Sequence, residues 1–282
     1  MVARLRRVLV CSPQAAGWDT PGQSSHWAEL GFRHAPDFAA AQAQHRELCQ
    51  QLELAGAEVV ELPASPELSL DAVYAHDPSL TTGRGMVILH PGKPNRVAEA
   101  KIHKKFCHDF GISVLGEVKS PAFAEAGDMV WLGSRTLLAG CGYRTNAAGI
   151  FQLRALLEGV EVITAPLPYG YGPSACLHLM SLMSLLNEHT ALVDLPWLAV
   201  ETVELLKARQ LRFVEIEASE RDTLACNVLA LGEKRLLALE ENPKTNEKLR
   251  AAGFEVLTFP GSELCINGGG GPTCLTRPLL RG

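Results

Sequence analysis

Cys274 is the residue whose surroundings point most clearly to chemistry. It follows four glycines and a proline in the stretch INGGGGPTC, residues 266–274. Glycine costs backbone entropy on folding, so such a run is expected only where the chain must take unusual dihedral angles or let another group approach closely. Apolar character resumes at Leu275, which places the run inside the fold. A thiol in such a loop is accessible to a substrate and is a strong nucleophile once deprotonated.

A cysteine nucleophile needs an acid/base partner, and His178 is the candidate. It lies in the apolar segment 175–182, after the turn-rich run 168–173. A histidine there is either a satisfied core residue or a positioned proton carrier. For the remaining seven cysteines we expect the ordinary role of a small buried apolar side chain.

Three carboxylates stand in otherwise apolar stretches. Glu125 and Asp128 lie in FAEAGDMV, and Asp77 lies in YAHDP. Buried acids are costly unless they are paired or hydrogen-bonded, and a turn before Pro78 explains one of these acids more easily than all three. Carboxylates beside a thiol would hold a cation. A guanidinium is the natural guest, because it is planar and pairs well with carboxylates.

A repeated pattern of helix, glycine and strand must position these residues. In each copy an amphipathic segment ends at a glycine and an alternating β run follows, which indicates an αβ turn. Clear copies lie at 54–63, 157–166 and 252–260, a fourth lies at 110–115, and a weaker fifth without the glycine lies at 210–216. The copies recur roughly every 40 to 55 residues, a period typical of stacked or radial units.

Further strands are expected between these copies, at 85–89, 129–132, 135–139, 190–193 and 234–239. A ββαβ unit repeated five times describes an α/β fold, a five-fold pseudosymmetric propeller whose loops converge on a central active site. We therefore expect one catalytic domain over residues 1–282. The alternative is a doubly wound α/β sheet, in which every αβ turn looks alike.

The composition favours a globular protein that acts on a small molecule. The chain has 47% hydrophobic and 20% charged residues, and its net charge of -5 comes from interspersed acids and bases, which argues against a nucleic-acid or membrane partner. The basic start has too short an apolar core for a signal peptide, so VLVCS is interpreted as the first strand. The eight cysteines form no C-x-x-C pair and no zinc spacing. We therefore expect free thiols in a reducing cytoplasm and no metal.

At these residues the sequence resembles the guanidino-group-modifying enzymes of the pentein superfamily, and within them dimethylarginine dimethylaminohydrolase most of all. The terminal loop GGGGPTC is similar to that of arginine deiminases. Each motif alone is weak, but together they run through nearly the whole chain in order. They are SSH from Ser24, DAVYAHDP from Asp71, PG at Pro91 with Arg96, EAGD from Glu125, RTNAAG from Arg144, LHL around His178, Asn227, and the terminal glycines with Cys274.

The resemblance implies a cofactor-free hydrolase that converts arginine or an N-methylated arginine into citrulline and an amine. It makes Cys274 the nucleophile, His178 the general acid and base, and Glu125 the carboxylate that orients His178. The substrate would be a small guanidino amino acid. The residues expected to bind it are Asp77 at the guanidinium, Asp71 near the α-amine, Arg96 and Arg144 at the carboxylate, and also His76 and Asp128.

Several departures and alternatives remain open. His76 stands where the dimethylarginine enzymes often have an acid, and Met180 stands where arginine deiminases have an aspartate. For Arg96 and Arg144 the alternative is a surface salt bridge. An arginine deiminase or dihydrolase is the main alternative function, while the short chain disfavours an amidinotransferase and the intact catalytic set disfavours a non-catalytic propeller. The oligomeric state is open, with a homodimer as one option.

Overall fold

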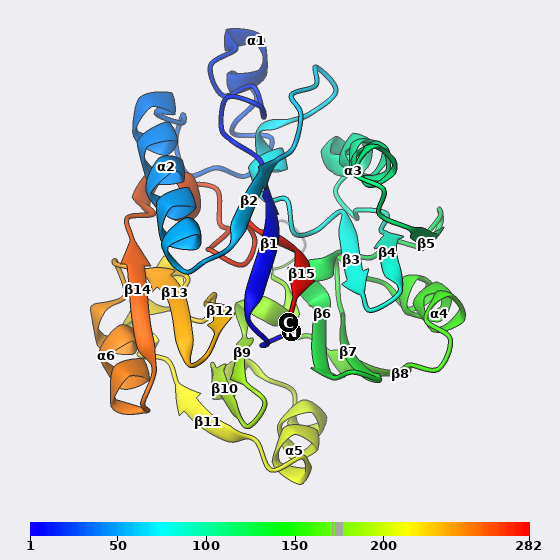
Figure 1. Cartoon of the computed structure of the whole chain (residues 1–282), viewed down its shortest axis with the longest axis vertical. Helices are drawn as coiled ribbons and strands as arrows, with labels where there is room; N and C mark the ends of the chain where they lie inside the picture. Colours follow the sequence, from blue (N-terminus) through cyan, green and yellow to red (C-terminus); the bar gives the residue numbers. More distant parts are fainter. Residues whose placement is uncertain (171, 173–176) are drawn as a thin grey trace.

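The structure is a computed structural model that describes residues 1–170, 172 and 177–282. Within these residues, fifteen strands form five three-stranded sheets arranged around one axis (Figure 1). In the sheet of β3, β4 and β5, for example, the first two strands pair antiparallel and the third pairs parallel to the second after a helix. This is the expected ββαβ unit, and the fold is the five-fold α/β propeller rather than a doubly wound sheet.

Four of the sheets in the described chain are each built from one continuous stretch. Their strands are β3 (Ser79–Thr82), β4 (Gly85–Ile88) and β5 (Val114–Glu117); β6 (Met129–Gly133), β7 (Thr136–Cys141) and β8 (Glu161–Pro166); β9 (Met183–Asn187), β10 (Thr190–Val193) and β11 (Arg212–Glu215); and β12 (Leu229–Gly232), β13 (Arg235–Leu239) and β14 (Glu255–Phe259). Their connecting helices are α3 (Val97–Asp109), α4 (Ala147–Leu156), α5 (Val200–Ala208) and α6 (Pro243–Ala251). No helix in the described part of the chain combines the length and the apolar character that a bilayer-crossing segment needs.

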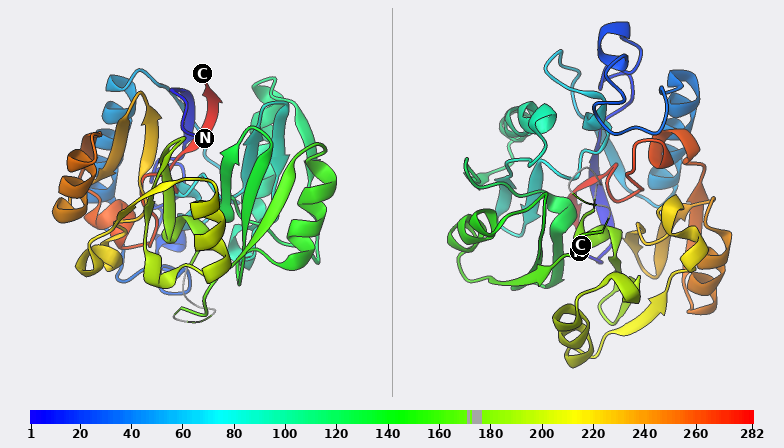
Figure 2. Two further views of the ribbon diagram at one scale, coloured as in Figure 1. Left: turned by 90° about the horizontal axis from the view of Figure 1, so that it is seen from below. Right: turned by 180° about the vertical axis from the view of Figure 1, so that it is seen from behind.

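The remaining sheet joins segments from the two ends of the sequence. Its strands are β1 (Leu5–Val10), β2 (Glu58–Glu61) and β15 (Arg277–Arg281), in the order β15-β1-β2, and the connection from β1 to β2 contains α1 (Pro21–Ser24) and α2 (Phe38–Leu54). β15 runs antiparallel to β1, and β2 runs parallel to it. The ends of the chain therefore lie together at one end of the central axis (Figure 2).

The αβ turns explain the sequence pattern. Gly56, Gly111, Gly159 and Gly253 have φ angles of 86°, 67°, 78° and 92°, in the left-handed region that favours glycine after a helix. In the fifth copy Gln210 takes the same conformation, with φ 60°. The copy that lacks the glycine therefore keeps the backbone geometry of the others, at the conformational cost of a side chain in the left-handed region.

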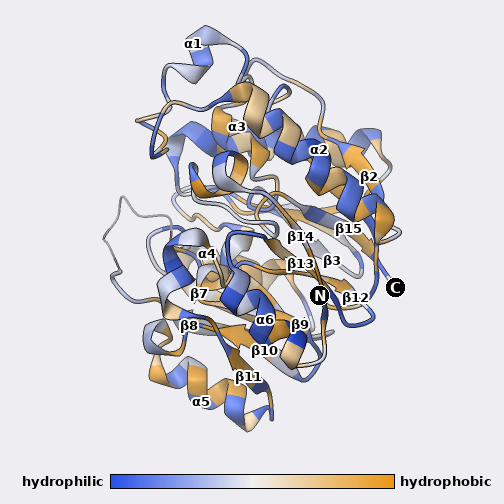
Figure 3. Cartoon of the chain, turned by 90° about the vertical axis from the view of Figure 1, so that its left-hand side faces the viewer, coloured by the Kyte–Doolittle hydropathy of each residue, from blue (hydrophilic) through white to orange (hydrophobic). Residues whose placement is uncertain are grey.

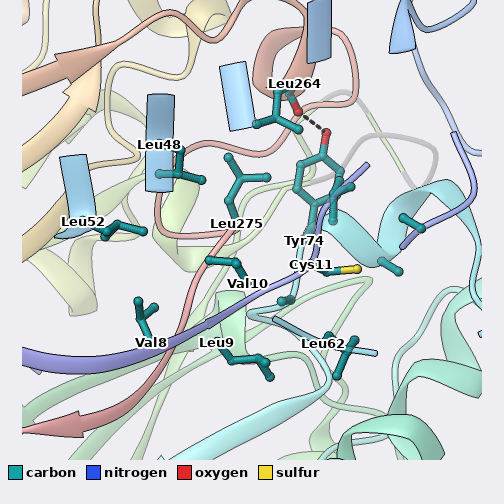
Figure 4. Close-up of a cluster of buried hydrophobic side chains, with 14 of the residues drawn as sticks. Val8, Leu9, Val10, Cys11, Leu48, Leu52, Leu62, Tyr74, Leu264 and Leu275 are labelled. Carbon is teal, nitrogen blue, oxygen red and sulfur yellow. Dashed lines mark hydrogen bonds between the residues drawn. The ribbon is translucent and has the colours of Figure 1, made fainter. Parts of the chain in front are cut away.

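The apolar core lies between the sheets and the helices outside them. The strands are mostly apolar, whereas apolar and polar residues are interspersed along the helices (Figure 3). In the sheet that contains β1, Val8 and Leu62 pack with Leu48 of α2, and the Tyr74 hydroxyl donates to the carbonyl of Leu264 at 3.3 Å (Figure 4). Full burial of one such leucine contributes about 1.5 to 3 kcal/mol. This packing fixes the strands whose loops carry the polar residues at the centre.

Candidate active site

The polar residues at the centre of the propeller come from equivalent loops. In each sheet the segment before the first antiparallel strand carries one of them: Asp77 before β3, Glu125 before β6, His178 before β9, Asn227 before β12 and Cys274 before β15. All except Glu125 line one cavity of about 630 Å³, and Glu125 contacts His178 from behind. The repeat thus brings together five side chains that are far apart in the sequence.

His178 and Glu125 form a buried hydrogen-bonded pair. Nε2 of His178 lies 2.7 Å from Oε2 of Glu125, whose side chain is fully buried. The amide of Gly92 donates to Oε1, and Nη2 of Arg144 donates to Oε2, both at 2.9 Å. Burial raises the pKa of Glu125, but the hydrogen bond from His178 and the charge of Arg144 outweigh burial, so the pKa is lowered. Glu125 is therefore ionised at neutral pH and favours a protonated His178 ring.

Two neighbours fix the position of His178. A Cβ built on Gly127 would lie 2.7 Å from Nδ1 of His178 and 3.0 Å from Oδ1 of Asp77, so the site has room only for glycine. Oδ1 of Asp128 accepts the amide of Leu179 at 2.9 Å. Burial raises the pKa of Asp128 to about 6. Asp128 does not line the cavity, and it holds the backbone beside His178 instead of facing a substrate.

Asp77 is a buried carboxylate at the cavity wall. Oδ2 accepts a hydrogen bond from Nη1 of Arg96 at 2.6 Å, and Oδ1 accepts the amide of Gly127 at 3.0 Å. Burial raises the pKa of Asp77, but the charges of His178 and Arg96 lower it by more, so it lies well below its usual range. Asp77 therefore keeps its negative charge at any physiological pH.

Arg96 is part of a buried ion network rather than a surface salt bridge. Its Nε and Nη2 atoms donate to the two oxygens of Glu99 at 2.9 and 2.8 Å, and Nη2 also donates to the carbonyl of Tyr74. Arg96 is 2% exposed. Burial raises the pKa of Glu99 to about 7 despite the charge of Arg96. The hydrogen bonds of Arg96 thus run to protein acceptors and hold Asp77 in place.

The thiol of Cys274 is held beside Asn227, whose Nδ2 lies 3.0 Å from Sγ. The glycines before Cys274 pass very close to other side chains. A Cβ on Gly268 would lie 2.1 Å from the hydroxyl oxygen of Tyr74, and a Cβ on Gly271 would lie 2.7 Å from Cγ of Asn227. Close approach therefore explains the glycine run, and it lets the loop carry Cys274 to the cavity.

A second polar group lies at another part of the cavity wall. Nζ of Lys93 donates to the carboxylate of Asp71 and to the carbonyl of Leu30, and these three residues all line the cavity. Asp71 is 4% exposed. Two acceptors are thus arranged to hold one ammonium group.

His76 does not face this cavity. Its Nδ1 atom lies 2.8 Å from the carbonyl oxygen of Thr276, and the residue lines a second cavity instead. Burial lowers the pKa of His76 to about 3, so the ring is neutral at physiological pH. A neutral ring in this position cannot replace the acid that the dimethylarginine enzymes often have there.

Sequence reasoning gave no role to two residues of the site. Asn227 was part of the ordered motifs but had no assigned contact, and Lys93 follows Pro91-Gly92 in a stretch that reads as an ordinary exposed turn. The signals for that turn were Pro91 and Gly92, and the amide of Gly92 contacts Glu125. Cys176 and parts of the run 168–173 lie outside the described residues, while the described cysteines are free thiols.

The arrangement can hold a planar cation beside a nucleophile. Asp77, Glu125 and His178 also offer ligand atoms that lie within 4.8 Å of one another, which is compatible with a metal ion. The guanidinium groups of Arg96 and Arg144 already bind the two carboxylates, at 2.6 and 2.9 Å. Two fixed positive charges at that distance oppose a divalent cation, so these residues are better suited to an organic cation.

Known proteins are similar to this chain in both fold and sequence. A solved structure of a cysteine-to-serine mutant of dimethylarginine dimethylaminohydrolase from Pseudomonas aeruginosa, complexed with citrulline, matches 99% of this chain and 100% of its own, with a TM-score of 0.77 and 26% identity. In sequence, the N(G),N(G)-dimethylarginine dimethylaminohydrolase of Pseudomonas aeruginosa is 28% identical over 230 residues, which cover 81% of this chain and 84% of the relative.

A second relative is the uncharacterized protein YkgA of Bacillus subtilis, which is 28% identical over 279 residues, covering 99% of this chain and 93% of the relative. A family model described as "N,N dimethylarginine dimethylhydrolase, eukaryotic" matches residues 31–281. The match covers most of the chain, and the sheets form the propeller seen in the solved relatives. The chain therefore belongs to the N,N-dimethylarginine dimethylhydrolase family of guanidino-modifying hydrolases, within the pentein superfamily.

Proposed function

We propose that this protein hydrolyses the guanidinium group of free arginine or an N-methylated arginine and releases citrulline and an amine. One observation carries the proposal: Cys274, His178 and Asp77 line the same cavity, and Glu125 lies 2.7 Å from His178. These groups supply a nucleophile, a proton carrier and a carboxylate for a cation, which this reaction requires.

In this proposal the thiol of Cys274 gives its proton to solvent as the cation binds, and the resulting thiolate bonds to the guanidinium carbon while a carbon–nitrogen double bond becomes single and Asp77 balances the charge of the cation. The bond from that carbon to the departing nitrogen then breaks, and His178 gives the nitrogen a proton so that the amine leaves. His178 next takes a proton from water, whose oxygen attacks the same carbon and displaces the sulfur. As the carbon–sulfur bond breaks, the hydroxyl proton of the adduct passes to the sulfur, which restores the thiol and leaves the carbon in the ureido group of citrulline. His178 keeps the proton from water, and the released amine takes up the proton that the thiol gave to solvent. Asn227, 3.0 Å from Sγ, is a donor that can hold the thiolate.

The contacts of Lys93 suggest where the α-ammonium group of a substrate would bind. Its ammonium group lies between Asp71 and the carbonyl of Leu30, and we propose that the α-ammonium of a substrate takes the same place. Arg144 lines the cavity and remains the proposed receptor for the α-carboxylate. Arg96, which is buried against Asp77 and Glu99, acts in this proposal as a support for Asp77 and not as a receptor.

The substrate is identified by a product assay. Purified protein is incubated with arginine, monomethylarginine, asymmetric dimethylarginine, agmatine and citrulline, and the products are measured as citrulline, ornithine, ammonia, methylamine and dimethylamine. We expect citrulline together with an alkylamine from a methylated arginine, or with ammonia from arginine. The Cys274→Ser protein is the matched control and should release none of them.

The same panel separates the alternatives. Ammonia from arginine without any alkylamine would identify a deiminase, and ornithine with two equivalents of ammonia would identify a dihydrolase. Turnover of agmatine but not of an amino acid would contradict the assignment of the α-carboxylate to Arg144. If no guanidine is consumed, the proposed activity is wrong.

We also propose that residues 1–282 form one catalytic domain that works in the cytoplasm. Strands from both ends of the sequence complete one sheet, which favours a single folding unit. The free thiols of the described cysteines fit a reducing compartment.

A further inference from the structure

Two loops of the catalytic cavity meet at Asn267. The early loop, residues 28–34, lies between α1 and α2, and the nucleophile loop, residues 267–274, precedes β15. Both loops line the cavity. Oδ1 of Asn267 accepts the amides of Arg33 and His34, both at 3.0 Å, and Nδ2 donates to the carbonyl of His34 at 3.2 Å. One side chain therefore joins the two loops by three hydrogen bonds.

The remaining donor of the Asn267 amide group has a partner as well. Nδ2 donates to Oε1 of Glu263 at 2.8 Å, and the same oxygen accepts the amide of Asp37 at 2.9 Å. A side-chain amide has two donors and one oxygen that accepts twice, so the whole capacity of Asn267 is used. Asn267 is 1% exposed. An aspartate here would lose both donors, and an alanine would leave the facing groups without their partner.

The glycine that follows Asn267 packs against the early loop. A Cβ on Gly268 would lie 2.8 Å from Cε1 of Phe32 and 2.1 Å from the hydroxyl oxygen of Tyr74. Phe32 is buried, and its ring makes an edge contact with Trp18 at 5.4 Å between the ring centroids. The nucleophile loop therefore cannot shift along the early loop without displacing buried aromatic side chains.

The two loops carry groups for the two ends of a substrate. On the early loop, the carbonyl of Leu30 accepts the ammonium group of Lys93, at the place proposed above for the α-ammonium. On the nucleophile loop, Cys274 is held by Asn227, whose Oδ1 accepts the amide of Thr273 at 3.0 Å and whose Nδ2 lies 3.0 Å from Sγ. The pliable glycine run is thus held by an asparagine at each end.

We propose that Asn267 is a positioning residue that fixes the span between the carbonyl of Leu30 and Sγ of Cys274. This span would select substrates by the number of methylene groups between the α-carbon and the guanidinium. The inference rests on the proposed function and adds the length of the substrate to it. Asn267 acts through the two loops and not on the reacting atoms. Without its side chain, the backbone bond from the amide of Arg33 to the carbonyl of Asn267 remains, at 3.0 Å, so the early loop can move while the fold is kept.

The test compares the substrate that the product assay identifies with its homologue that has one more methylene group, for example arginine with homoarginine. One methylene group changes kcat/KM by about 10- to 200-fold in a fitted site, and we expect the wild-type protein to discriminate within this range. Asn267→Ala should reduce the ratio of the two kcat/KM values at least about fivefold, because the loosened early loop accepts both lengths.

Asn246→Ala is the matched control. Asn246 lies in α6, is 2% exposed and donates to the carbonyl of Leu239 at 2.8 Å. The variant therefore loses a buried amide that hydrogen-bonds neither loop, and it should keep the wild-type ratio. A general loss of stability would change both variants alike, whereas a role in positioning changes the ratio only in Asn267→Ala.

Two measurements do not depend on turnover. In hydrogen exchange followed by mass spectrometry, the amides of residues 28–34 should exchange at least about tenfold faster in Asn267→Ala than in wild type or Asn246→Ala. Alkylation of Cys274 by 2-chloroacetamidine, a cationic amidine without an amino-acid end, should stay within about threefold of wild type. The thiol keeps its contact with Asn227, so the variant should disturb the α-ammonium end of the site and spare the nucleophile.

The inference is overturned if wild type does not discriminate between the two lengths, if Asn267→Ala keeps the wild-type ratio or the wild-type exchange of residues 28–34, or if Asn246→Ala changes the ratio equally. Alkylation that slows more than about tenfold in Asn267→Ala would assign the residue to the nucleophile instead. If Asn267→Ala does not fold, Asn267→Asp decides, because it keeps the size of the side chain and removes both donors; its ratio should fall at least about threefold.

Failure of the inference can be told from failure of the proposed function. If wild type consumes no guanidine, the proposed function is wrong and selection by length is wrong with it, while the exchange of residues 28–34 still decides whether Asn267 joins the loops. If wild type consumes its substrate and the ratio is the same in Asn267→Ala, only the inference is rejected.

Discussion

Replacing Asp77 by asparagine tests the site most directly. Oδ2 of Asp77 accepts from Arg96 and Oδ1 accepts from Gly127. An asparagine amide nitrogen would face one of these two donors in either orientation. The variant therefore loses a buried ion pair as well as a negative charge, and we expect its free energy of unfolding to fall by about 3 to 5 kcal/mol. Urea denaturation measures this loss and sets a temperature at which the variant is fully folded.

The effect on turnover follows from the charge. A carboxylate about 4 Å from a guanidinium contributes about 4 kcal/mol at an effective dielectric constant of about 20. Arg96 lies 2.6 Å from Asp77 and cancels part of this attraction. We therefore expect the interaction of Asp77 with the guanidinium to contribute about 2 to 3 kcal/mol to transition-state binding. Each 1.36 kcal/mol or so is a factor of ten. We therefore expect kcat/KM for citrulline formation to fall about a hundredfold in the Asp77→Asn protein.

Glu99→Gln is the matched control. Glu99 binds the same arginine, is 1% exposed and does not line the cavity. Glu99 is separated from the cavity by Arg96, so its replacement should change kcat/KM by less than about threefold. Our reasoning is refuted if folded Asp77→Asn stays within about threefold of wild type. An equal fall in kcat/KM in the Asp77→Asn and Glu99→Gln proteins would also refute this reasoning, because both substitutions would then lower turnover through Arg96, the residue that they share as a partner.

Three further predictions concern other contacts of the site. Cys274→Ser should keep the fold and lose turnover, and mass spectrometry after an acid quench should find a covalent adduct on wild type only; activity above about a tenth of wild type would remove the thiol from the mechanism. Lys93→Met should lower KM for an amino-acid substrate about fivefold, because the α-ammonium no longer competes for Asp71; a higher KM would make Lys93 a substrate-binding residue. Asp128→Asn should raise the free energy of unfolding by about 3 kcal/mol at pH 8. The pKa of Asp128 in the folded protein, about 6, exceeds its ordinary value of 3.8, so the wild-type protein loses stability as pH rises from about 4 through about 6 and this carboxyl ionises. Denaturation at pH 4 and pH 8 checks that the stability gained by the variant at pH 8 disappears at pH 4.

The propeller could be predicted from the sequence because each repeat contains short local patterns, a helix that ends at a glycine and a strand that follows it. Glycines such as Gly56 and Gly159 mark αβ turns by their own backbone preference, and strands such as β13, with the sequence RLLAL, are continuous apolar runs that are buried on both faces. The first strand of most sheets was harder to predict. β3 and β9, with the sequences SLTT and MSLLN, are short and follow irregular loops, so they lack both the length and the alternation that a pattern needs.

The site could be predicted by residue type but not by side-chain direction. Cys274, His178 and Asp77 line one cavity as expected, because each belongs to the same loop of its repeat. His76 is adjacent to Asp77 in sequence yet lines the other cavity. Both residues lie in the turn at 75–78, before β3 begins, and a sequence motif does not specify side-chain directions in such a turn. The roles of Arg96 and Lys93 depend on partners, Glu99 and Leu30, that no motif connects with them.

The pairing of β15 with β1 makes assembly of the active centre depend on two segments that are synthesised far apart in time. Leu5 pairs with Arg281, and Arg6 donates to Gly282, 276 residues later. β1 cannot gain its antiparallel neighbour until residues 277–281, more than 260 positions later, have been made. The strand that completes this sheet also directly follows Cys274. A nascent or truncated chain that ends before β15 therefore lacks both the closed ring and a positioned thiol, and so the ability to consume its substrate is acquired together with the complete fold.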